Sequence, residues 1–201
     1  TNPRKNAEML AVDTSQADAM RGVLKIVELP NGVGVIADNT WRAFRAADAV
    51  TCEWETADYP ATTAGMFDAV AASFNEDHRD SRFRDEGDVD AALSGDILEA
   101  EYRVPYLAHS TMEPMTAVAW LRDGALDIWA GTQFPTQVRE EGAALTGLGG
   151  DSIAVHTALM GGGFGRRGEL DFSVLATRVA MALPGTPVMT TWSREEDMRR
   201  D

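Results

Sequence analysis

A glycine-rich segment, Met160-Gly-Gly-Gly-Phe-Gly-Arg-Arg167, carries the residue types that point most directly to ligand binding. It lies between an apolar segment expected to be a strand and a segment with helical periodicity. Glycines let backbone N–H groups approach a ligand closely, and the start of a helix adds positive potential. With Arg166 and Arg167 as planar donors, the pattern suits a phosphate or another oxyanion. The spacing matches neither Gly-x-Gly-x-x-Gly nor a P-loop, so a glycine-rich turn without a ligand is at least as good an interpretation.

A second group of polar side chains occurs in His109-Ser-Thr-Met-Glu-Pro-Met115. His109 and Glu113 would share one face of a helix, but Pro114 disfavours helical geometry at Glu113. We therefore interpret this segment as a polar turn rather than a metal site. Gln133 lies between an expected strand and an expected helix, and a hydrogen bond at the helix entry is its simplest role.

The common catalytic patterns are missing from the sequence. There is no Ser-His-Asp order with an elbow motif, no Cys-x-x-Cys, and no pair of carboxylates in an apolar setting. His156 lies inside an apolar strand, where a structural role is the simplest interpretation. His78 lies in an acidic stretch and is expected to be solvated.

Composition excludes several classes of function. The 201 residues include 32 Asp+Glu and 18 Lys+Arg, a formal net charge of −14, so the surface repels phosphate backbones and we expect no nucleic-acid partner. No apolar stretch approaches the roughly 20 residues that a membrane helix needs, and no membrane span is expected. Cys52 is the only cysteine and cannot form an intramolecular disulfide.

Residues 1–75 are expected to form a small α+β unit. Segments 23–27 and 33–37 flank turn residues and predict a hairpin, and 51–55 is a further strand. Between them, a helix begins near Trp41. Another helix begins at Thr62 or Thr63, and its apolar face comprises Met66, Phe67, Val70, Ala71 and Phe74. The acidic residues 76–96 are expected to be a solvated connector.

Residues 97–201 are expected to form a second α+β domain. The segments 97–106, 116–121 and 126–130 predict an antiparallel meander. A capped helix is expected between Phe134 and Gly147, and strands are expected at 153–159 and 187–192. The helix 171–183 carries an apolar face of Phe172, Leu175, Val179 and Leu183. Residues 193–201 start like a helix and lack a C-cap, which is typical of a piece cut from a longer protein. Charge composition alone would favour the alternative, a frayed, charged tail.

Four motifs follow the order and approximate spacing of a known family. They are Tyr102-Arg-Val-Pro-Tyr-Leu-Ala-His-Ser-Thr-Met-Glu-Pro-Met115, Trp129-Ala-Gly-Thr-Gln133, Gly161-Gly-Gly-Phe-Gly-Arg-Arg167 and Trp192-Ser-Arg-Glu-Glu-Asp-Met198. Together they resemble the molybdopterin-binding subunit of the xanthine dehydrogenase and aldehyde oxidase family, isoquinoline oxidoreductase beta-subunit type. Val12-Asp-Thr-Ser15, Gly22-Val23 and Val35-Ile-Ala-Asp-Asn-Thr-Trp41 resemble the end of its α/β-hammerhead domain, so the resemblance implies that end followed by the first part of the cofactor-binding α+β domain.

The resemblance implies a molybdenum pyranopterin cofactor, whose nucleotide form it leaves open, the cytosine dinucleotide form being one candidate. The backbone of the loop would contact the cofactor, and Gln133 would hydrogen-bond an oxygen ligand of the metal. The implied cofactor-binding residues are Gln133, Gly162, Gly163, Phe164, Gly165 and Arg166. The resemblance assigns no metal ligand to the protein. The intact enzyme would oxidise an aldehyde or an N-heteroaromatic substrate with oxygen from water and pass electrons to a two-iron two-sulfur subunit.

Two departures limit this resemblance. Purine-oxidising members carry Glu where this chain has Gly168, with Glu169 one place later, which puts a xanthine-type substrate in doubt. The catalytic Glu of the family lies near the C-terminus of a much longer subunit, so we expect no catalytic residue here, and no activity or cofactor without the remainder of the subunit. The resemblance favours the periplasm over the cytoplasm. The alternatives are an acidic scaffold whose loop binds no cofactor, and an unrelated nucleotide-binding protein.

Overall fold

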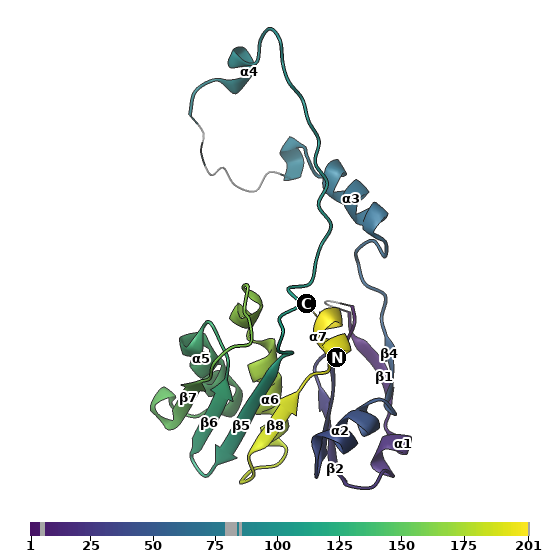
Figure 1. The fold of residues 1–201 in the computed structure, drawn as a ribbon, viewed down its shortest axis with the longest axis vertical. Helices are drawn as coiled ribbons and strands as arrows, with labels where there is room; N and C mark the ends of the chain where they lie inside the picture. The colour runs from purple at the N-terminus through teal and green to yellow at the C-terminus, as the bar shows by residue number, and fades with distance from the viewer. Residues whose placement is uncertain (5–6, 79–83, 85, 201) are drawn as a thin grey trace. The chain divides into compact units, whose positions relative to one another are not determined.

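In a computed structural model of the protein, residues 1–4, 7–78, 84 and 86–200 are described (Figure 1). The chain divides into two compact units, of which one combines Thr1–Thr56 with Ala108–Asp201 and the other comprises Ala57–Leu107. The boundaries 1–75, 76–96 and 97–201 stay a prediction.

The N-terminal part of the first unit contains two small antiparallel pairs. β1 (Met9–Asp13) pairs with β4 (Thr51–Trp54), and β2 (Val23–Leu29) pairs with β3 (Gly32–Ala37). The helices here are α1 (Ser15–Asp18) and α2 (Thr40–Ala47). The predicted hairpin, helix and strand are therefore confirmed, whereas β1 was not expected. The side chain of Asn39 accepts a hydrogen bond from the backbone N–H of Arg42, which explains where α2 begins.

The C-terminal part of the first unit is a four-stranded sheet with helices on one face. The strand order is β7-β6-β5-β8, in which β5 is antiparallel to both neighbours and β6 is parallel to β7. The expected α+β class with antiparallel strands is confirmed. The elements are β5 (Thr116–Arg122), β6 (Ala125–Ala130), α5 (Pro135–Thr146), η2 (Gly150–Ser152), β7 (Ile153–Thr157), η3 (Arg166–Gly168), α6 (Asp171–Met181), β8 (Val188–Thr191) and α7 (Arg194–Arg200).

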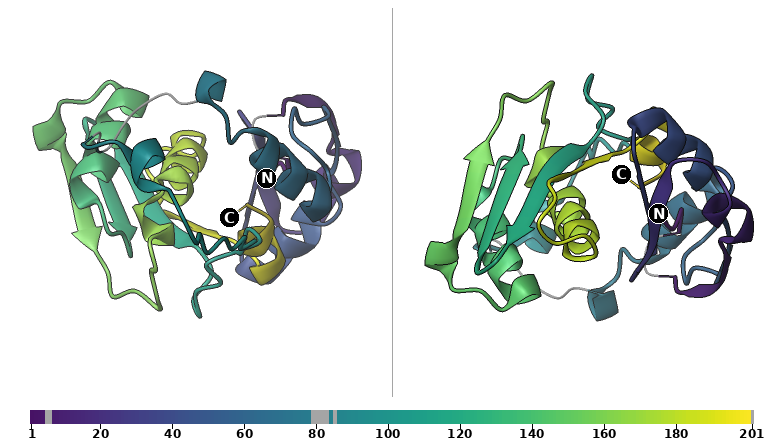
Figure 2. Two further views of the ribbon diagram at one scale, coloured as in Figure 1. Left: turned by 90° about the horizontal axis from the view of Figure 1, so that it is seen from above. Right: turned by 90° about the horizontal axis from the view of Figure 1, so that it is seen from below.

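Helix α6 joins the two parts of this unit into one core. It lies against the sheet on one side and approaches the β2–β3 hairpin on the other (Figure 2). Three residues of the predicted apolar face, Phe172, Leu175 and Val179, are buried as expected. The helix ends at Met181, however, so Leu183 lies beyond it and is only partly buried. Gly34 lets β3 approach α6 closely, since a Cβ atom there would lie 2.7 Å from Cγ2 of Val179. Core residues of the sheet include Ala117, Ala119, Leu126, Ile128 and Ile153.

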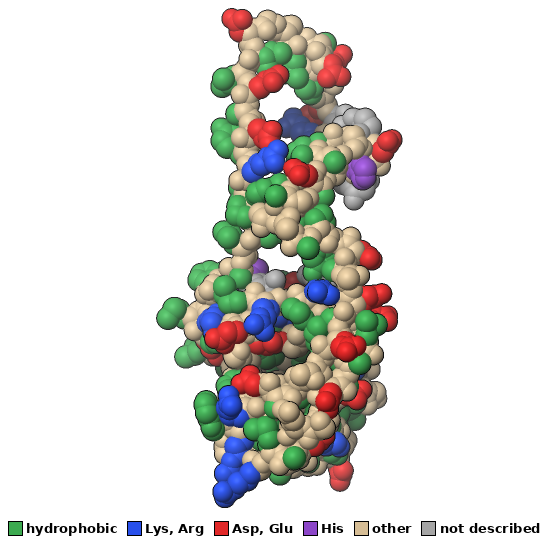
Figure 3. All heavy atoms as spheres, turned by 90° about the vertical axis from the view of Figure 1, so that its right-hand side faces the viewer, with side chains coloured by type: hydrophobic (Ala, Val, Ile, Leu, Met, Phe, Trp, Pro, Cys, Tyr) green, Lys and Arg blue, Asp and Glu red, His purple; other side chains and the backbone are tan. Residues whose placement is uncertain are grey.

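The second unit contains little buried surface in its described residues. It comprises α3 (Thr63–Ala72), η1 (Glu76–His78) and α4 (Val89–Ala92), and Thr62 caps α3 by accepting from the N–H of Gly65. The helix was predicted, but none of its residues is buried. Apolar side chains at the surface of this unit are drawn in green in the upper part of Figure 3. Residues 79–83 and 85 of the predicted connector lie outside the described residues.

The strand predicted at 97–106 is wrong. These residues form no ladder with any described residue, and Leu98, Tyr102 and Tyr106 are exposed. Alternation alone does not make a strand, because its backbone N–H and C=O groups need a partner. In the sheet, β8 takes the place beside β5 that the predicted meander gave to this segment. Among the described residues, no helix has the length and apolar character to cross a membrane.

Candidate functional site

Three separate segments meet at one end of the four-stranded sheet. Ala117 pairs with Ala130 in the β5–β6 hairpin, and Ala130 lies beside Thr157 of β7. The chain therefore enters β5, leaves β6 and leaves β7 at the same end of the sheet. This topology brings together 109–115, the junction 131–133 and the glycine-rich loop 161–165.

The structure places Gln133 directly against the glycine-rich loop. The N–H of Gly165 donates to Oε1 of Gln133 at 3.2 Å. A Cβ atom at Gly163 would lie 3.0 Å from the same oxygen, and one at Gly165 would lie 3.7 Å from Nε2 of His109. Because Oε1 accepts this bond, the amide NH₂ group of Gln133 is left to donate elsewhere. Within the described residues, this NH₂ group has no hydrogen-bond partner.

The hydrogen bonds of the loop carbonyls determine where the backbone N–H groups of the loop point. Its carbonyl oxygens turn inward, since those of Gly161, Gly162 and Gly163 accept from the N–H of Glu113 (3.1 Å), Nε of Arg167 (2.7 Å) and the N–H of Arg166 (2.9 Å). No peptide is cis. In a trans peptide the N–H of the next residue points opposite to the carbonyl.

The amides of Gly162, Gly163 and Phe164 therefore face away from those inward contacts, and in the described part of the chain they form no hydrogen bond. Positive φ angles of 102° at Gly162, 54° at Phe164 and 100° at Gly165 produce this turn, and Phe164 adopts a left-handed conformation unusual for a residue with a side chain. Successive backbone N–H groups without an internal acceptor can form a concavity suited to an oxyanion or another electron-rich oxygen.

The side chains of the two arginines after the loop were expected to donate to a ligand, but both donate to groups of the protein. The Arg166 side chain is buried, and its Nη1 and Nη2 donate to Oδ1 (2.9 Å) and Oδ2 (3.1 Å) of Asp171 in a bidentate ion pair. Asp171 begins α6, where a carboxylate is favourable. The Arg167 side chain is also buried. A role of Arg166 toward a cofactor stays a prediction.

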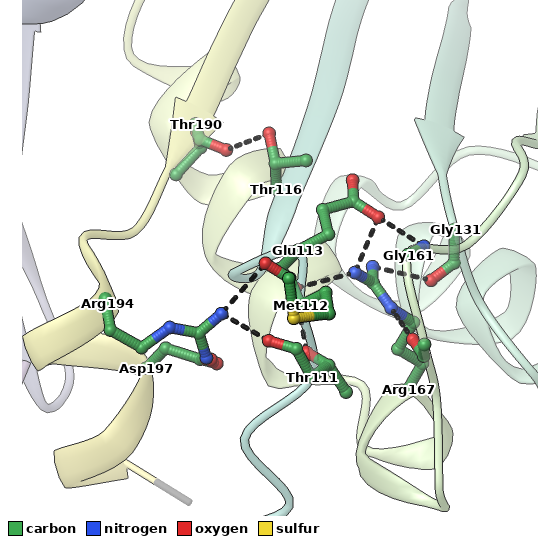
Figure 4. A network of polar contacts seen from close by, with 11 residues as sticks. Thr111, Met112, Glu113, Thr116, Gly131, Gly161, Arg167, Thr190, Arg194 and Asp197 are labelled. Atoms are coloured by element: carbon green, nitrogen blue, oxygen red, sulfur yellow. Dashed lines mark hydrogen bonds and ion pairs between the residues drawn. The ribbon is translucent and has the colours of Figure 1, made fainter.

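Arg167 connects all three segments of the site (Figure 4). Its guanidinium donates to the carbonyls of Gly162, Gly131 (3.2 Å) and Glu113 (3.0 Å), and Nη2 lies 2.8 Å from Oε2 of Glu113. The same carboxylate oxygen accepts from the N–H of Gly161 at 2.8 Å. The sequence predicted a polar turn at Glu113 rather than a metal site, and it gave no indication of the pairing with Arg167. No local pattern links residues 54 positions apart.

Other candidate groups lie elsewhere. His156 is on β7, where its Nε2 lies 2.9 Å from Oδ1 of Asp127 and its ring stacks on Trp129 with centroids 4.6 Å apart. This agrees with the structural role predicted for it. Among the described residues, no group of three or more His, Cys, Asp and Glu side chains could hold a metal ion. Gly168 is covered by the ring of Phe134, since a Cβ atom there would lie 2.8 Å from Cε2.

A family model described as the molybdopterin cofactor-binding domain matches residues 74–201. The isoquinoline 1-oxidoreductase subunit beta of Brevundimonas diminuta is 29% identical over 204 residues, which cover 94% of this chain and 26% of that protein. The membrane-bound aldehyde dehydrogenase of Gluconacetobacter polyoxogenes, whose name specifies pyrroloquinoline quinone, is 27% identical over 209 residues, covering 98% of this chain and 27% of that protein. The relatives also include aldehyde oxidases and a molybdenum-binding subunit of xanthine dehydrogenase.

Among solved structures, quinoline 2-oxidoreductase from Pseudomonas putida 86 superposes with a TM-score of 0.70 at 24% identity, over 95% of this chain and 30% of that chain. This likeness shows a shared fold. The chain spans about a quarter of the length of the two curated relatives described above.

Proposed function

Because the chain belongs to the molybdopterin cofactor-binding domain family of the xanthine dehydrogenase and aldehyde oxidase type, we propose that it is part of the large subunit of a molybdenum hydroxylase. The observation that carries this proposal is the joint presentation of the loop amides and the Gln133 amide at one end of the sheet. In this proposal residues 1–75 are the end of an α/β-hammerhead domain, and residues 97–201 begin the cofactor-binding domain.

The residues present fit a molybdenum pyranopterin. Oxygen ligands of the metal carry negative charge, and N–H donors fixed before binding stabilise such charge without reorganising. The amides of Gly162, Gly163 and Phe164 would contact the cofactor, because the first two carry no side chain that would keep it away. Gln133 would donate its NH₂ group to a metal oxygen. The cytosine dinucleotide form of the pterin is part of the proposal, to be checked by mass spectrometry of the extracted cofactor.

The bound cofactor would supply the two-electron oxidation of an aldehyde or N-heteroaromatic carbon, with water as the source of oxygen. The residues of this chain would bind and orient the cofactor: the loop amides would hold it, and the Gln133 amide would donate to one of its oxygen atoms. Proton transfer would fall to a Glu in the remainder of the large subunit, so this piece is inactive by itself. A two-iron two-sulfur subunit would accept the electrons.

The test is molybdenum analysis of the longer polypeptide, produced with its iron–sulfur subunit. The proposal expects close to one molybdenum per large subunit and hydroxylation of an aldehyde or an N-heterocycle. Pyrroloquinoline quinone in place of molybdenum would refute it, as would a full-length protein that carries no cofactor.

Within that enzyme, Gln133→Ala should reduce kcat by on the order of 10²-fold, the typical loss when one preorganised donor is removed. The fold should be retained, because the side chain of Gln133 is exposed. Gln137→Ala is the matched control, since Gln137 is an exposed residue of the same type on α5. Unchanged turnover of a molybdenum-loaded Gln133→Ala enzyme would remove Gln133 from the site.

A further inference from the structure

Arg167, which follows the glycine-rich loop, has a fully buried side chain, which is unusual for a charged residue. Burying a guanidinium is costly unless its N–H groups are satisfied, and here they are directed at groups of the protein. Nε and Nη1 each donate to one backbone carbonyl, and Nη2 donates to both the carbonyl and the carboxylate of Glu113. All these acceptors belong to the three segments that form the site.

The bond from Nε determines which way one loop amide faces. Since it holds the carbonyl of Gly162 inward at 2.7 Å, the N–H of Gly163 must point outward from the same peptide plane. Glu113 acts similarly one residue earlier, because its backbone N–H holds the carbonyl of Gly161. The Glu113 carboxylate, in turn, bonds both Arg167 and the N–H of Gly161. The pair therefore sets two successive amides.

The backbone of Arg167 also places the other donor of the site. Its carbonyl oxygen accepts from the N–H of Gln133 at 3.0 Å and from Oγ1 of Thr132 at 3.3 Å. Gln133 is thus anchored to the residue whose side chain orients the loop. One residue fixes the loop amides and the Gln133 amide relative to each other.

We infer that Arg167 and Glu113 are positioning residues that hold the loop amides and Gln133 in the arrangement that binds the cofactor. This inference rests on the proposed function. The pair touches the loop from the inner side and donates nothing to the ligand itself. Groups that hydrogen-bond the direct ligands of a metal typically change metal affinity or activity by about 10- to 100-fold when they are replaced. We expect an effect of the same order for residues that orient the donors of a cofactor.

The experiment compares molybdenum content per large subunit in the full-length enzyme produced with its partner subunit. Arg167→Lys keeps a positive charge but loses the forked geometry that reaches Gly162, Gly131 and Glu113 together. We expect its molybdenum content to fall about 10-fold or more when cofactor is limiting. Glu113→Gln, which keeps an acceptor for the N–H of Gly161, should show a smaller loss. If Arg167→Lys does not fold, the molybdenum content of Glu113→Gln tests the inference instead.

Two controls separate positioning from general stability. Val188→Ala removes buried atoms from β8 and should lower the unfolding temperature while molybdenum content is retained. Arg122→Lys makes the same exchange in the ion pair with Asp127, at the turn end of the β5–β6 hairpin and away from the site. Its molybdenum content should equal that of the wild type. If molybdenum content falls with unfolding temperature equally in Val188→Ala and Arg167→Lys, the pair has only a structural role. Wild-type content in Arg167→Lys, or in Glu113→Gln where only that variant folds, also overturns the inference. Absence of molybdenum from the wild-type enzyme refutes the proposed function instead.

Discussion

Gly163→Ala should separate binding at the loop from stability of the fold. The φ angle at Gly163 is not among the positive ones, so an added methyl group meets no backbone strain. Its Cβ atom would lie 3.0 Å from Oε1 and 3.3 Å from Cδ of Gln133. These atoms are the end of a flexible, exposed side chain, which can move away. The substitution therefore displaces the Gln133 amide and leaves the loop backbone largely in place.

The cost in stability follows from the one bond that is lost. When Gln133 moves, the N–H of Gly165 loses its acceptor Oε1 but becomes accessible to water. An intramolecular hydrogen bond contributes about 0.5–1.5 kcal/mol net. For a chain of this size about 1 kcal/mol changes the unfolding temperature by roughly 2–4 °C. Turnover of the loaded enzyme should fall far more, by on the order of 10²-fold, because one preorganised donor is lost.

The assay combines thermal unfolding, molybdenum content and kcat per bound molybdenum. Gly149→Ala is the control, since no atom lies within 4 Å of a Cβ atom there and its φ angle is −65°. It should be neutral or stabilise the chain by about 0.4–1 kcal/mol. A wild-type kcat of Gly163→Ala with molybdenum bound would show that the Gln133 amide is not a donor to the cofactor. Unfolding far below the expected range would show that Gln133 cannot move aside without disturbing the fold.

Three further predictions concern the scaffold. Asp171→Asn removes the carboxylate paired with the buried Arg166 and should destabilise the chain by about 3–5 kcal/mol in denaturant titrations, a loss under about 1 kcal/mol being contradictory. Phe172→Ala should cost about 3–5 kcal/mol, because this side chain is 1% exposed at the centre of the core, and a wild-type midpoint would contradict that placement. Burial raises the pKa of the Cys52 thiol above its ordinary value of 9.0. The thiolate is thus disfavoured in the folded chain, and the stability of wild type relative to Cys52→Ala should fall as pH rises above that value, which pH-dependent unfolding measures.

The elements that the sequence predicted correctly are those set by neighbours along the chain. The β2–β3 hairpin follows from turn residues between two apolar runs, and α2 begins where Asn39 can cap it. Helix α6 follows from a periodic apolar face. None of these requires knowledge of a distant partner.

Pairing between distant segments could not be predicted in the same way. The β1–β4 pair and the insertion of β8 beside β5 join strands separated by long stretches of chain. Residues 97–106, wrongly predicted as a strand, have the alternation of a strand but pair with no described residue. Alternation states which side chains share a face, and says nothing about which backbone lies alongside.

The same distinction applies within the site. Spacing identified the glycine loop, but only the resemblance to a family connected it with Gln133. The arginines show why spacing was insufficient: adjacent cationic residues look equivalent in sequence, yet Arg166 pairs with Asp171 five residues on, and Arg167 with Glu113. Which acceptor each one meets depends on the fold of the sheet.

The loop is held in part by Glu113, a residue far from it in the sequence. Two of the inward bonds, from Arg166 and Arg167, are local, but the third comes from the N–H of Glu113. The segment 111–113 is itself held from its other side by Arg194 of α7, which donates to the carbonyls of Thr111 and Met112 (Figure 4). One arginine thus lies on each side of the segment whose Glu113 N–H sets the direction of the Gly162 amide. Helix α7 therefore contributes to holding the segment that orients the loop, beside the contacts of Arg167.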